Sequence, residues 1–289
     1  MKIILGTAQF GMKYGINNHD GILSDEKLKN LLIKAKQQQI IHFDTALDYG
    51  NAQKRLGKIG LKGFKFISKL KSLSSFENLQ EKVNEILNQL NTKKIYALLF
   101  HSPSELIENP IIWSWFKELK NTHPDLKIGY SVYNIEELDY LLKIGIIPEI
   151  IQIPFNIFDH EFEDRFEQLV KLNIEIHVRS VFMQGLFFMD PDNLPYKVLG
   201  IKNELKQLNK ICMKWNISVG HAALQFVANK KQISGVVIGI DSINQLDDNI
   251  NFFSLPLPQQ FCDELNKQFR NLDNPLKKIN EWKKVKIPS

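Results

Sequence analysis

Four titratable side chains stand at or just after the ends of short apolar runs of the sequence. They are Asp44, Tyr49, Lys69 and His101. Each one alone has an ordinary structural explanation, because a carboxylate after a strand often caps the next helix and a lysine there is often a solvated charge. A carboxylate, a phenol, an ammonium and an imidazole that meet at one end of a fold are typical of an acid–base site. These residues can act together only if the fold brings the ends of their runs to one place.

Short β-branched or apolar runs alternate with amphipathic helical patterns along the chain. We expect eight strands, at residues 3–6, 41–44, 66–69, 97–101, 127–131, 150–154, 175–179 and 235–239. We expect helices at residues 25–39 with Ser24 as the N-cap, and at 51–59, 76–89, 112–121, 135–144, 162–172, 201–215, 219–228 and 245–252. This alternation predicts parallel strands that are joined by crossover helices.

The number of strand–helix units favours a closed (β/α)8 TIM barrel, with residues 1–289 as a single domain. An open doubly wound sheet would require a glycine fingerprint after the first strand, and residues 6–11 do not match G-x-G-x-x-G. We expect residues 187–200, in the long connection before the last strand, to form a loop. A barrel carries its functional residues at the carboxyl ends of its strands, where the four titratable side chains stand.

Composition and charge exclude several other classes of protein. Hydrophobic residues make up 44% of the chain and charged residues 24%, which is typical of a soluble globular protein and not of a disordered one. The net charge of +5 comes from scattered lysines, so we expect no nucleic-acid partner. The two cysteines lack C-x-x-C spacing, which indicates neither a zinc site nor a disulfide framework. No apolar run is long enough for a membrane span or a signal peptide, and we expect a cytoplasmic protein without a bound metal or a membrane partner.

The sequence resembles the aldo-keto reductase family over almost its whole length. The matching segments are Leu5-Gly6-Thr7-Ala8, Phe43-Asp44-Thr45-Ala46, Tyr49-Gly50, Leu56-Gly57, Ser68-Lys69, Leu99-Phe100-His101, Gly129-Tyr130-Ser131, Ile151-Gln152, Gln184-Gly185-Leu186 and residues 239–249. The resemblance implies a barrel that binds NADPH or NADH without a Rossmann domain. It also implies the reduction of a small-molecule aldehyde or ketone, with a sugar-type carbonyl among the candidates.

The resemblance assigns a role to each of the four titratable residues. Tyr49 would donate a proton to the carbonyl oxygen as the hydride arrives at carbon. Lys69 would lower the pKa of Tyr49, and Asp44 would keep Lys69 charged and oriented. His101 would donate a hydrogen bond to the carbonyl oxygen.

Cofactor contacts follow from the resemblance in the same way. Ser131 and Gln152 would bind the nicotinamide carboxamide, with the backbone at Gly6 and Thr7 close by. The segment that holds Arg179, Ser180, Phe182, Gln184 and Gly185 would cover the pyrophosphate. The adenosine end would meet Gly239, Asp241, Ser242, Gln245 and Asn249. For this last stretch, a plain helix N-terminus capped by Asp241 or Ser242 is the alternative interpretation.

Three positions depart from the pattern of the family. Val132 stands where an asparagine commonly follows the serine of the fifth strand. Arg179 stands where an aromatic residue usually stacks on the nicotinamide. Asp241 stands where many members have a lysine or an arginine, and a carboxylate there would repel a 2′-phosphate and could accept hydrogen bonds from a free ribose. The choice between NADPH and NADH therefore stays open.

Other functions and the substrate also stay open at this point. The alternatives are a nucleotide-binding regulatory barrel without turnover, an NAD-dependent dehydrogenase that works in the oxidative direction, and a metal-dependent hydrolase. The presence of all four titratable residues argues against the first, and the seven histidines show no H-x-H or H-E-x-x-H spacing for the last. Candidate residues for the substrate pocket are Phe10, Met12, Tyr14, Trp113, Phe155, Phe158 and residues 182–189.

Overall fold

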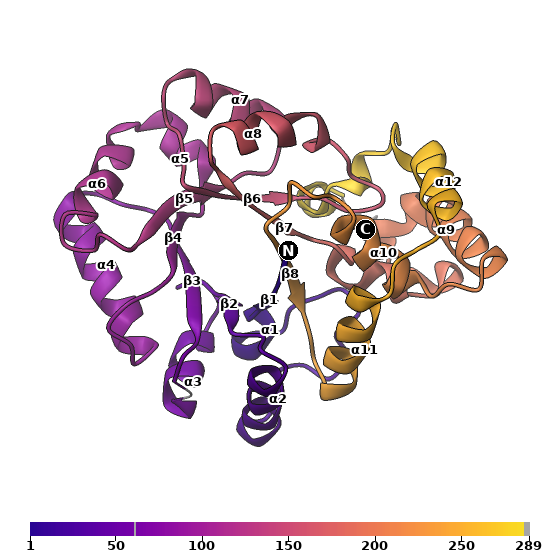
Figure 1. Cartoon of the computed structure of the whole chain (residues 1–289), viewed down its shortest axis with the longest axis horizontal. Helices are drawn as coiled ribbons and strands as arrows, with labels where there is room; N and C mark the ends of the chain where they lie inside the picture. Colours follow the sequence, from indigo (N-terminus) through magenta and orange to yellow (C-terminus); the bar gives the residue numbers. More distant parts are fainter. Residues whose placement is uncertain (61, 286–289) are drawn as a thin grey trace.

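Eight parallel strands close into a barrel in the order of the sequence, which confirms the predicted (β/α)8 fold (Figure 1). The computed structural model describes residues 1–60 and 62–285. The strands are β1 (Lys2–Gly6), β2 (His42–Asp44), β3 (Lys65–Leu70), β4 (Ala97–Phe100), β5 (Lys127–Ser131), β6 (Ile150–Pro154), β7 (Glu175–Arg179) and β8 (Gly235–Gly239). The barrel closes where β1 pairs with β8 in parallel, with Gly6 beside Gly239.

Helices surround the barrel and cover the outside of its strands (Figure 1). Because both faces of such a strand are buried, its sequence is apolar throughout, as in Ala97-Leu98-Leu99-Phe100. The α-helices are α1 (Ala8–Gly11), α2 (Asp25–Gln37), α3 (Ala52–Ile59), α4 (Phe76–Gln89), α5 (Pro103–Glu108), α6 (Ile111–Leu119), α7 (Ile135–Lys143), α8 (Phe166–Lys171), α9 (Lys202–Lys214), α10 (Val219–Ala228), α11 (Ile243–Ser254) and α12 (Gln259–Phe269). The 3-10 helices are η1 (Glu163–Arg165), η2 (Met183–Phe188), η3 (Pro191–Asn193), η4 (Tyr196–Ile201), η5 (Pro275–Lys277) and η6 (Ile279–Lys283).

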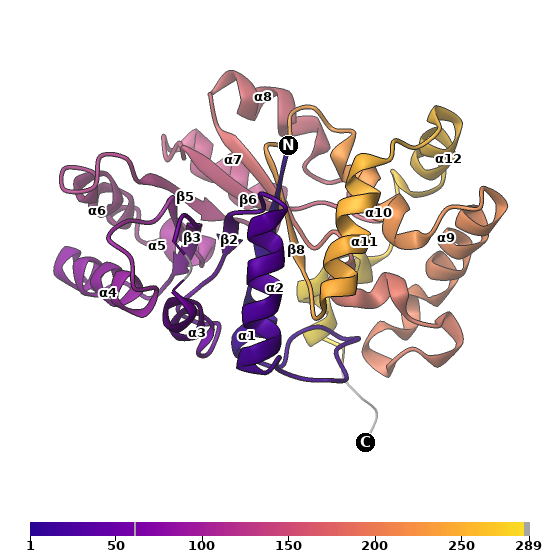
Figure 2. The ribbon, with the colours of Figure 1, turned by 60° about the horizontal axis from the view of Figure 1, so that its bottom comes forward.

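Most predicted boundaries agree with the structure to within two residues. Ser24 is the N-cap of α2, as predicted, and its hydroxyl accepts a hydrogen bond from the amide of Lys27 at 3.2 Å. Strands β5 to β8 have the predicted bounds. Helix α11 lies against α2 on the outside of the barrel, beside the seam where the first and last strands meet (Figure 2).

Several predictions about elements were wrong. His101 follows β4 instead of ending it. The predicted helix at 162–172 is split into η1 and α8, and the predicted loop at 187–200 contains η3 and parts of η2 and η4. The sequence analysis also missed α1, α5 and α12. Two of these, α1 and α5, are shorter than two helical turns, so they carry too few residues for a periodic pattern to stand out.

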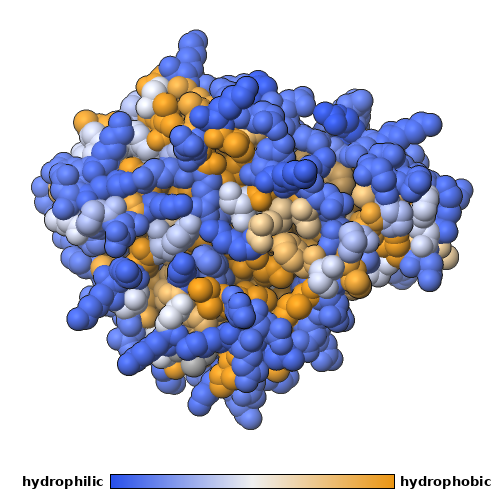
Figure 3. Space-filling view, in the orientation of Figure 1, coloured by the Kyte–Doolittle hydropathy of each residue, from blue (hydrophilic) through white to orange (hydrophobic). Residues whose placement is uncertain are grey.

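The surface of the barrel end that faces the viewer in Figure 1 carries mostly hydrophilic side chains with smaller apolar patches between them (Figure 3). Within residues 1–60 and 62–285, no helix is both long enough and apolar enough to cross a membrane.

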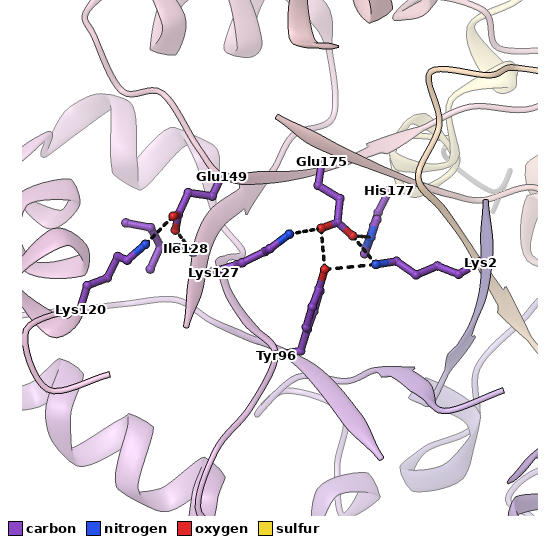
Figure 4. Close-up of polar contacts among 8 residues, drawn as sticks. All are labelled: Lys2, Tyr96, Lys120, Lys127, Ile128, Glu149, Glu175 and His177. Atoms are coloured by element: carbon purple, nitrogen blue, oxygen red, sulfur yellow. Dashed lines mark hydrogen bonds and ion pairs between the residues drawn. The ribbon is translucent and has the colours of Figure 1, made fainter. Parts of the chain in front are cut away.

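A polar network closes the amino-terminal end of the barrel (Figure 4). The carboxylate of Glu175 on β7 forms ion pairs with Lys2 on β1 and Lys127 on β5. It also accepts a hydrogen bond from the hydroxyl of Tyr96 at 2.6 Å and lies 2.7 Å from Nε2 of His177. These partners outweigh burial and hold the pKa of Glu175 well below its usual range. One carboxylate therefore links strands from opposite sides of the barrel.

We predict that Glu175→Gln lowers the free energy of unfolding by roughly 2 kcal/mol at pH 7, because two lysines lose their counter-charge. The folded-state pKa of Glu175 is depressed, so its contribution is present above the usual pKa of 4.5 and is lost as the pH falls. Urea unfolding at pH 7 and at pH 4 measures this, and the difference between wild type and variant should shrink at pH 4. The control is Asp247→Asn, which removes an exposed partner of Lys34. Equal stability of Glu175→Gln and wild type at pH 7 would contradict the assignment.

Candidate active site

A buried ion pair lies at the carboxyl end of the barrel. Asp44 at the end of β2 pairs with Lys69 on β3, and the two side chains are 4% and 1% exposed. The ammonium of Lys69 also donates to the carbonyl of Thr45 at 3.2 Å. From β6, Nε2 of Gln152 donates to the second carboxylate oxygen of Asp44 at 2.7 Å. Both oxygens of the carboxylate therefore have partners, which a buried charge requires.

Tyr49 and His101 lie next to this pair, so the barrel brings the four predicted catalytic residues together. The ammonium of Lys69 is 5.0 Å from the centroid of the Tyr49 ring. The rings of Tyr49 and His101 meet edge to face, with centroids 6.2 Å apart. Nδ1 of His101 is 3.8 Å from a carboxylate oxygen of Asp48. The site thus contains a phenol and an imidazole in contact with each other, next to a paired ammonium and carboxylate.

The protonation of these residues differs from the sequence-based expectation in one respect. Burial and the Asp44 carboxylate raise the pKa of Tyr49 well above its usual value, whereas we expected Lys69 to lower it. The physical reason is that burial disfavours the charged phenolate and the carboxylate of Asp44 repels it. Burial also lowers the pKa of Lys69, and the adjacent Asp44 opposes this effect. Tyr49 is therefore protonated at neutral pH and holds a proton that it can donate.

His101 is neutral over the whole physiological range. Burial, together with the positive charges of Lys69, Arg179 and Lys71, lowers the pKa of His101 from the usual 6.5 to about 3. A neutral imidazole has one N–H group, which can donate a hydrogen bond without carrying charge.

A cavity of about 380 Å³ opens beside the catalytic group and continues along the ends of β7, β8 and β1. Asp44, Tyr49 and Gln152 line one end. Predicted cofactor-binding residues line the remainder, namely Gly6, Thr7, Arg179, Ser180, Phe182, Gln184, Gly185, Gly239, Asp241, Gln245 and Asn249. The side chain of Gln9 packs on the backbone of Gly239, so that a Cβ at this position would lie 2.3 Å from Nε2 of Gln9 and would displace the end of that side chain.

Arg179 is fixed at the catalytic end of the cavity. Its Nη2 donates to the carbonyl of Val132 at 3.1 Å, and its Nη1 donates to the hydroxyl of Ser180 at 3.3 Å. The guanidinium lies 4.6 Å from the centroid of the Tyr133 ring. The backbone carbonyl of Val132 therefore helps to hold Arg179, which stands where the sequence pattern of the family has an aromatic residue.

Acidic residues line the opposite end of the cavity. Asp241 follows β8, and its amide donates to the side chain of Gln245 at 2.8 Å. One carboxylate oxygen of Asp241 is buried without a hydrogen-bond partner in the described part of the chain. Burial and the nearby Asp20 raise the pKa of Asp241. This oxygen can accept a hydrogen bond from a ligand hydroxyl, and Asp248 adds a second carboxylate to the lining.

Four predicted site residues do not line the cavity. Lys69 and His101 are both in contact with the ring of Tyr49. Ser131 is 1% exposed next to Gln152, and its buried hydroxyl has no partner within the described residues. Ser242 is the N-cap of α11, where it accepts a hydrogen bond from the amide of Gln245 at 3.2 Å. The helix-capping alternative is therefore correct for Ser242 and not for Asp241.

The sequence analysis missed several residues of the cavity. Asp248 and Phe252 line it from α11, three and seven residues after Gln245. This spacing puts them on one helical face with Gln245 and Asn249, so periodicity could have identified them. Gln9, Asn17 and Asn18 line it from the segment after β1, where no periodic pattern marks their side chains.

Most of the aromatic residues proposed for the substrate pocket belong to the core. Phe10, Trp113, Phe155 and Phe158 are at most 4% exposed and lie in the hydrophobic cluster between barrel and helices. They do not line the cavity, because the ring of helices buries them behind the strands. Tyr14, Phe182 and Phe188 do line it, and Met12 is exposed nearby in sequence.

Two glycines fix the turn that carries Tyr49. A Cβ on Gly11 would lie 2.0 Å from the carbonyl oxygen of Tyr49. Gly50 has φ +56°, and a Cβ there would lie 2.3 Å from the carbonyl oxygen of Gly11. Arg55 on α3 adds to this contact, since its guanidinium donates to the carbonyls of Phe10 and Leu23. The ends of the segment between β1 and α2 are thus tied to the helix that follows Tyr49.

Within residues 1–60 and 62–285, no group of three or more His, Cys, Asp or Glu side chains has an arrangement that could hold a metal ion.

The structure is a closed (β/α)8 barrel with a cavity at the carboxyl ends of its strands, and comparison with known proteins gives its family. The model of the aldo/keto reductase family matches residues 2–268, so the chain belongs to the aldo-keto reductase family. Over 90 residues it is 29% identical to an uncharacterised oxidoreductase of Schizosaccharomyces pombe, a match that covers 31% of this chain and 33% of that protein. The chain thus spans only a third of the length of this relative.

Solved structures share the fold along nearly the whole chain. An aldo-keto reductase from Bacillus halodurans, AKR11C1, superposes with a TM-score of 0.76 at 20% identity, covering 95% of this chain and 94% of that one. A glycerol dehydrogenase from Gluconobacter oxydans, AKR11B4, superposes with a TM-score of 0.71 at 18% identity, covering 94% and 93%. At these identities the likeness concerns the fold alone.

We predict that the ring protons of His101 do not titrate between pH 8 and pH 5, because its pKa lies at about 3. Proton NMR of the wild type over this range measures the shift, and His101→Gln assigns the signal. A titration midpoint near 6.5 would contradict the burial of this ring among positive charges.

Proposed function

We propose that this enzyme reduces an aldehyde or ketone to an alcohol with a nicotinamide cofactor, and that residues 1–289 act as one domain. The single observation that carries the proposal is the cluster of Tyr49, the Asp44–Lys69 pair and His101 beside the cavity. A bound reduced nicotinamide supplies the hydride. The residues of the chain supply the proton, the orientation and the polar environment of the oxygen.

Tyr49 is the proton donor in this proposal. Its raised pKa keeps the hydroxyl protonated, and the carbonyl oxygen becomes a strong base as hydride reaches the neighbouring carbon. The paired ammonium of Lys69 lies under the ring, where it can stabilise the negative charge that remains after the proton leaves. Neutral His101 donates a hydrogen bond to the same oxygen and orients the carbonyl.

The unpartnered polar atoms of the site suit a dinucleotide. The hydroxyls of Thr7 and Ser131 and one oxygen of Asp241 are buried and lack partners in residues 1–60 and 62–285. Ser131 and Gln152 would hold the carboxamide, and Thr7 with the backbone of Gly6 would lie beside it. Buried polar atoms are costly unless a ligand or water satisfies them, and two of these atoms, on Thr7 and Asp241, belong to residues that line the cavity, which supports a polar ligand.

We also propose that the preferred cofactor is NADH. Asp241 and Asp248 line the end of the cavity that would take the adenosine ribose, and no lysine or arginine of the described residues lines that end. A 2′-phosphate would lie among carboxylates without a counter-charge, whereas a free ribose hydroxyl can donate to Asp241.

We predict that Tyr49→Phe lowers the turnover of carbonyl reduction by about 10²- to 10⁴-fold, because it removes only the proton donor. The dissociation constant of NADH, measured by fluorescence titration, should change by less than about threefold, since the ring still packs over Lys69. A screen of aldehydes and keto-sugars with both cofactors first identifies a substrate. Turnover equal to that of the wild type would refute the role of Tyr49 as the acid.

We predict that Asp241→Arg shifts the ratio of kcat/KM for NADPH over NADH upward by about tenfold or more, because an arginine can pair with the 2′-phosphate. The matched control is Asp247→Arg, which makes the same change of charge on α11 at a residue that pairs with Lys34 outside the cavity. If the ratio is the same in wild type and Asp241→Arg, Asp241 does not meet the ribose.

A further inference from the structure

Arg179 differs from the other arginines of this chain in having no carboxylate partner among the described residues. Arg55 pairs with Asp25, Arg165 with Asp139 and Arg270 with Asp164. The contacts of Arg179 are the carbonyl of Val132, the hydroxyl of Ser180 and the face of Tyr133, and all of these are neutral. An arginine that is tethered but not neutralised keeps its charge available to a ligand.

This charge is the net charge of the catalytic end of the cavity. Asp44 and Lys69 neutralise each other, and His101 is neutral because its pKa is about 3. Arg179 is also the one cation among the described residues that line the cavity. The charge of Arg179 acts on the catalytic residues, because it lowers the pKa values of both Tyr49 and His101.

We infer that Arg179 makes the site select the reduced over the oxidised nicotinamide cofactor, an inference that rests on the proposed function. The two forms share the same pyrophosphate and riboses and differ in the ring, which is neutral when reduced and carries one positive charge when oxidised. A fixed guanidinium at the end of the cavity that holds the ring repels only the oxidised form. The chain would therefore load the reduced cofactor from a mixture of both and release the oxidised product readily, which favours work in the direction of reduction.

The size of the effect follows from the distance and the surroundings of the charge. At about 10 Å and an effective dielectric constant of about 20, one charge acting on another already changes a binding ratio by about tenfold. The cavity is partly enclosed, so salt screens this interaction less than it would at an open surface. A tenfold ratio corresponds to a rise of about 30 mV in the reduction potential of the bound two-electron couple.

The competing role for Arg179 is a contact with the pyrophosphate. Such a contact would stabilise both redox forms equally, because the pyrophosphate is the same in each. The ratio of the two dissociation constants therefore separates the roles, whereas either constant alone does not. A merely structural role of Arg179 would likewise leave the ratio unchanged.

The experiment measures the dissociation constants of NADH and NAD⁺ by fluorescence titration and calorimetry at pH 7, without carbonyl substrate. The proteins are the wild type, Arg179→Gln, Arg179→Lys and Arg179→Met, the last of which keeps an aliphatic stem against Tyr133. The matched control is Arg270→Gln, which removes an arginine charge on α12, away from the cavity lining. Circular dichroism and thermal unfolding establish that each variant folds.

We expect the ratio of the NAD⁺ constant to the NADH constant to fall by about tenfold in Arg179→Gln and Arg179→Met, and to change by less than about threefold in Arg179→Lys and Arg270→Gln. If both constants of the neutral variants rise by the same factor, the inference is overturned while the proposed function stands. If the wild type binds neither cofactor, the proposed function fails and the inference fails with it.

Discussion

The buried ion pair of Asp44 and Lys69 is the interaction on which the site depends. Two charges that are almost fully buried are tolerated only if they meet each other and if their remaining hydrogen-bonding atoms are satisfied. Here the second oxygen of Asp44 is satisfied by Gln152, which comes from β6, four strands further along the barrel. The complete set of contacts of Asp44 can therefore form only when the barrel brings β6 opposite β2. Barrel closure and the chemistry of the site are thus coupled through one carboxylate.

The same pair decides the electrostatics around Tyr49. Because the charges of Asp44 and Lys69 offset each other, the environment of the phenol is set by burial, and its proton is held firmly until a strong base arrives. The ammonium still lies under the ring and can respond when negative charge develops. Tyr49 is therefore protonated before the reaction, and the ammonium of Lys69 can stabilise its phenolate after the proton has left.

The two ends of the cavity carry opposite charges, and each charge suits one part of a dinucleotide. The unpaired guanidinium of Arg179 lies at the catalytic end, and the carboxylates of Asp241 and Asp248 lie at the other. We propose that the first selects the redox state and the second selects the ribose over its phosphate. Both preferences would rest on long-range electrostatic interactions. These depend on which end of the cavity carries the charge, and less on any particular hydrogen bond.

The sequence by itself determined the barrel and most of the site. Alternating apolar runs and amphipathic patterns predict eight strand–helix units, and side chains at the ends of parallel strands must lie at one end of the barrel, so Asp44, Tyr49, Lys69 and His101 could be assigned to one site. Asp241 and Arg179 could be identified as unusual because they change charge or shape at a known position of the pattern.

Only the tertiary structure decided that Gln152 binds Asp44, that Ser242 caps a helix while Asp241 faces the cavity, and that Phe10, Phe155 and Phe158 belong to the core. It also decided that the pKa of Tyr49 is raised and that Arg179 has no carboxylate partner among residues 1–60 and 62–285. The physical reason is that strand order follows from local periodicity, whereas burial and charge pairing depend on residues far apart in the sequence that meet only when the barrel closes.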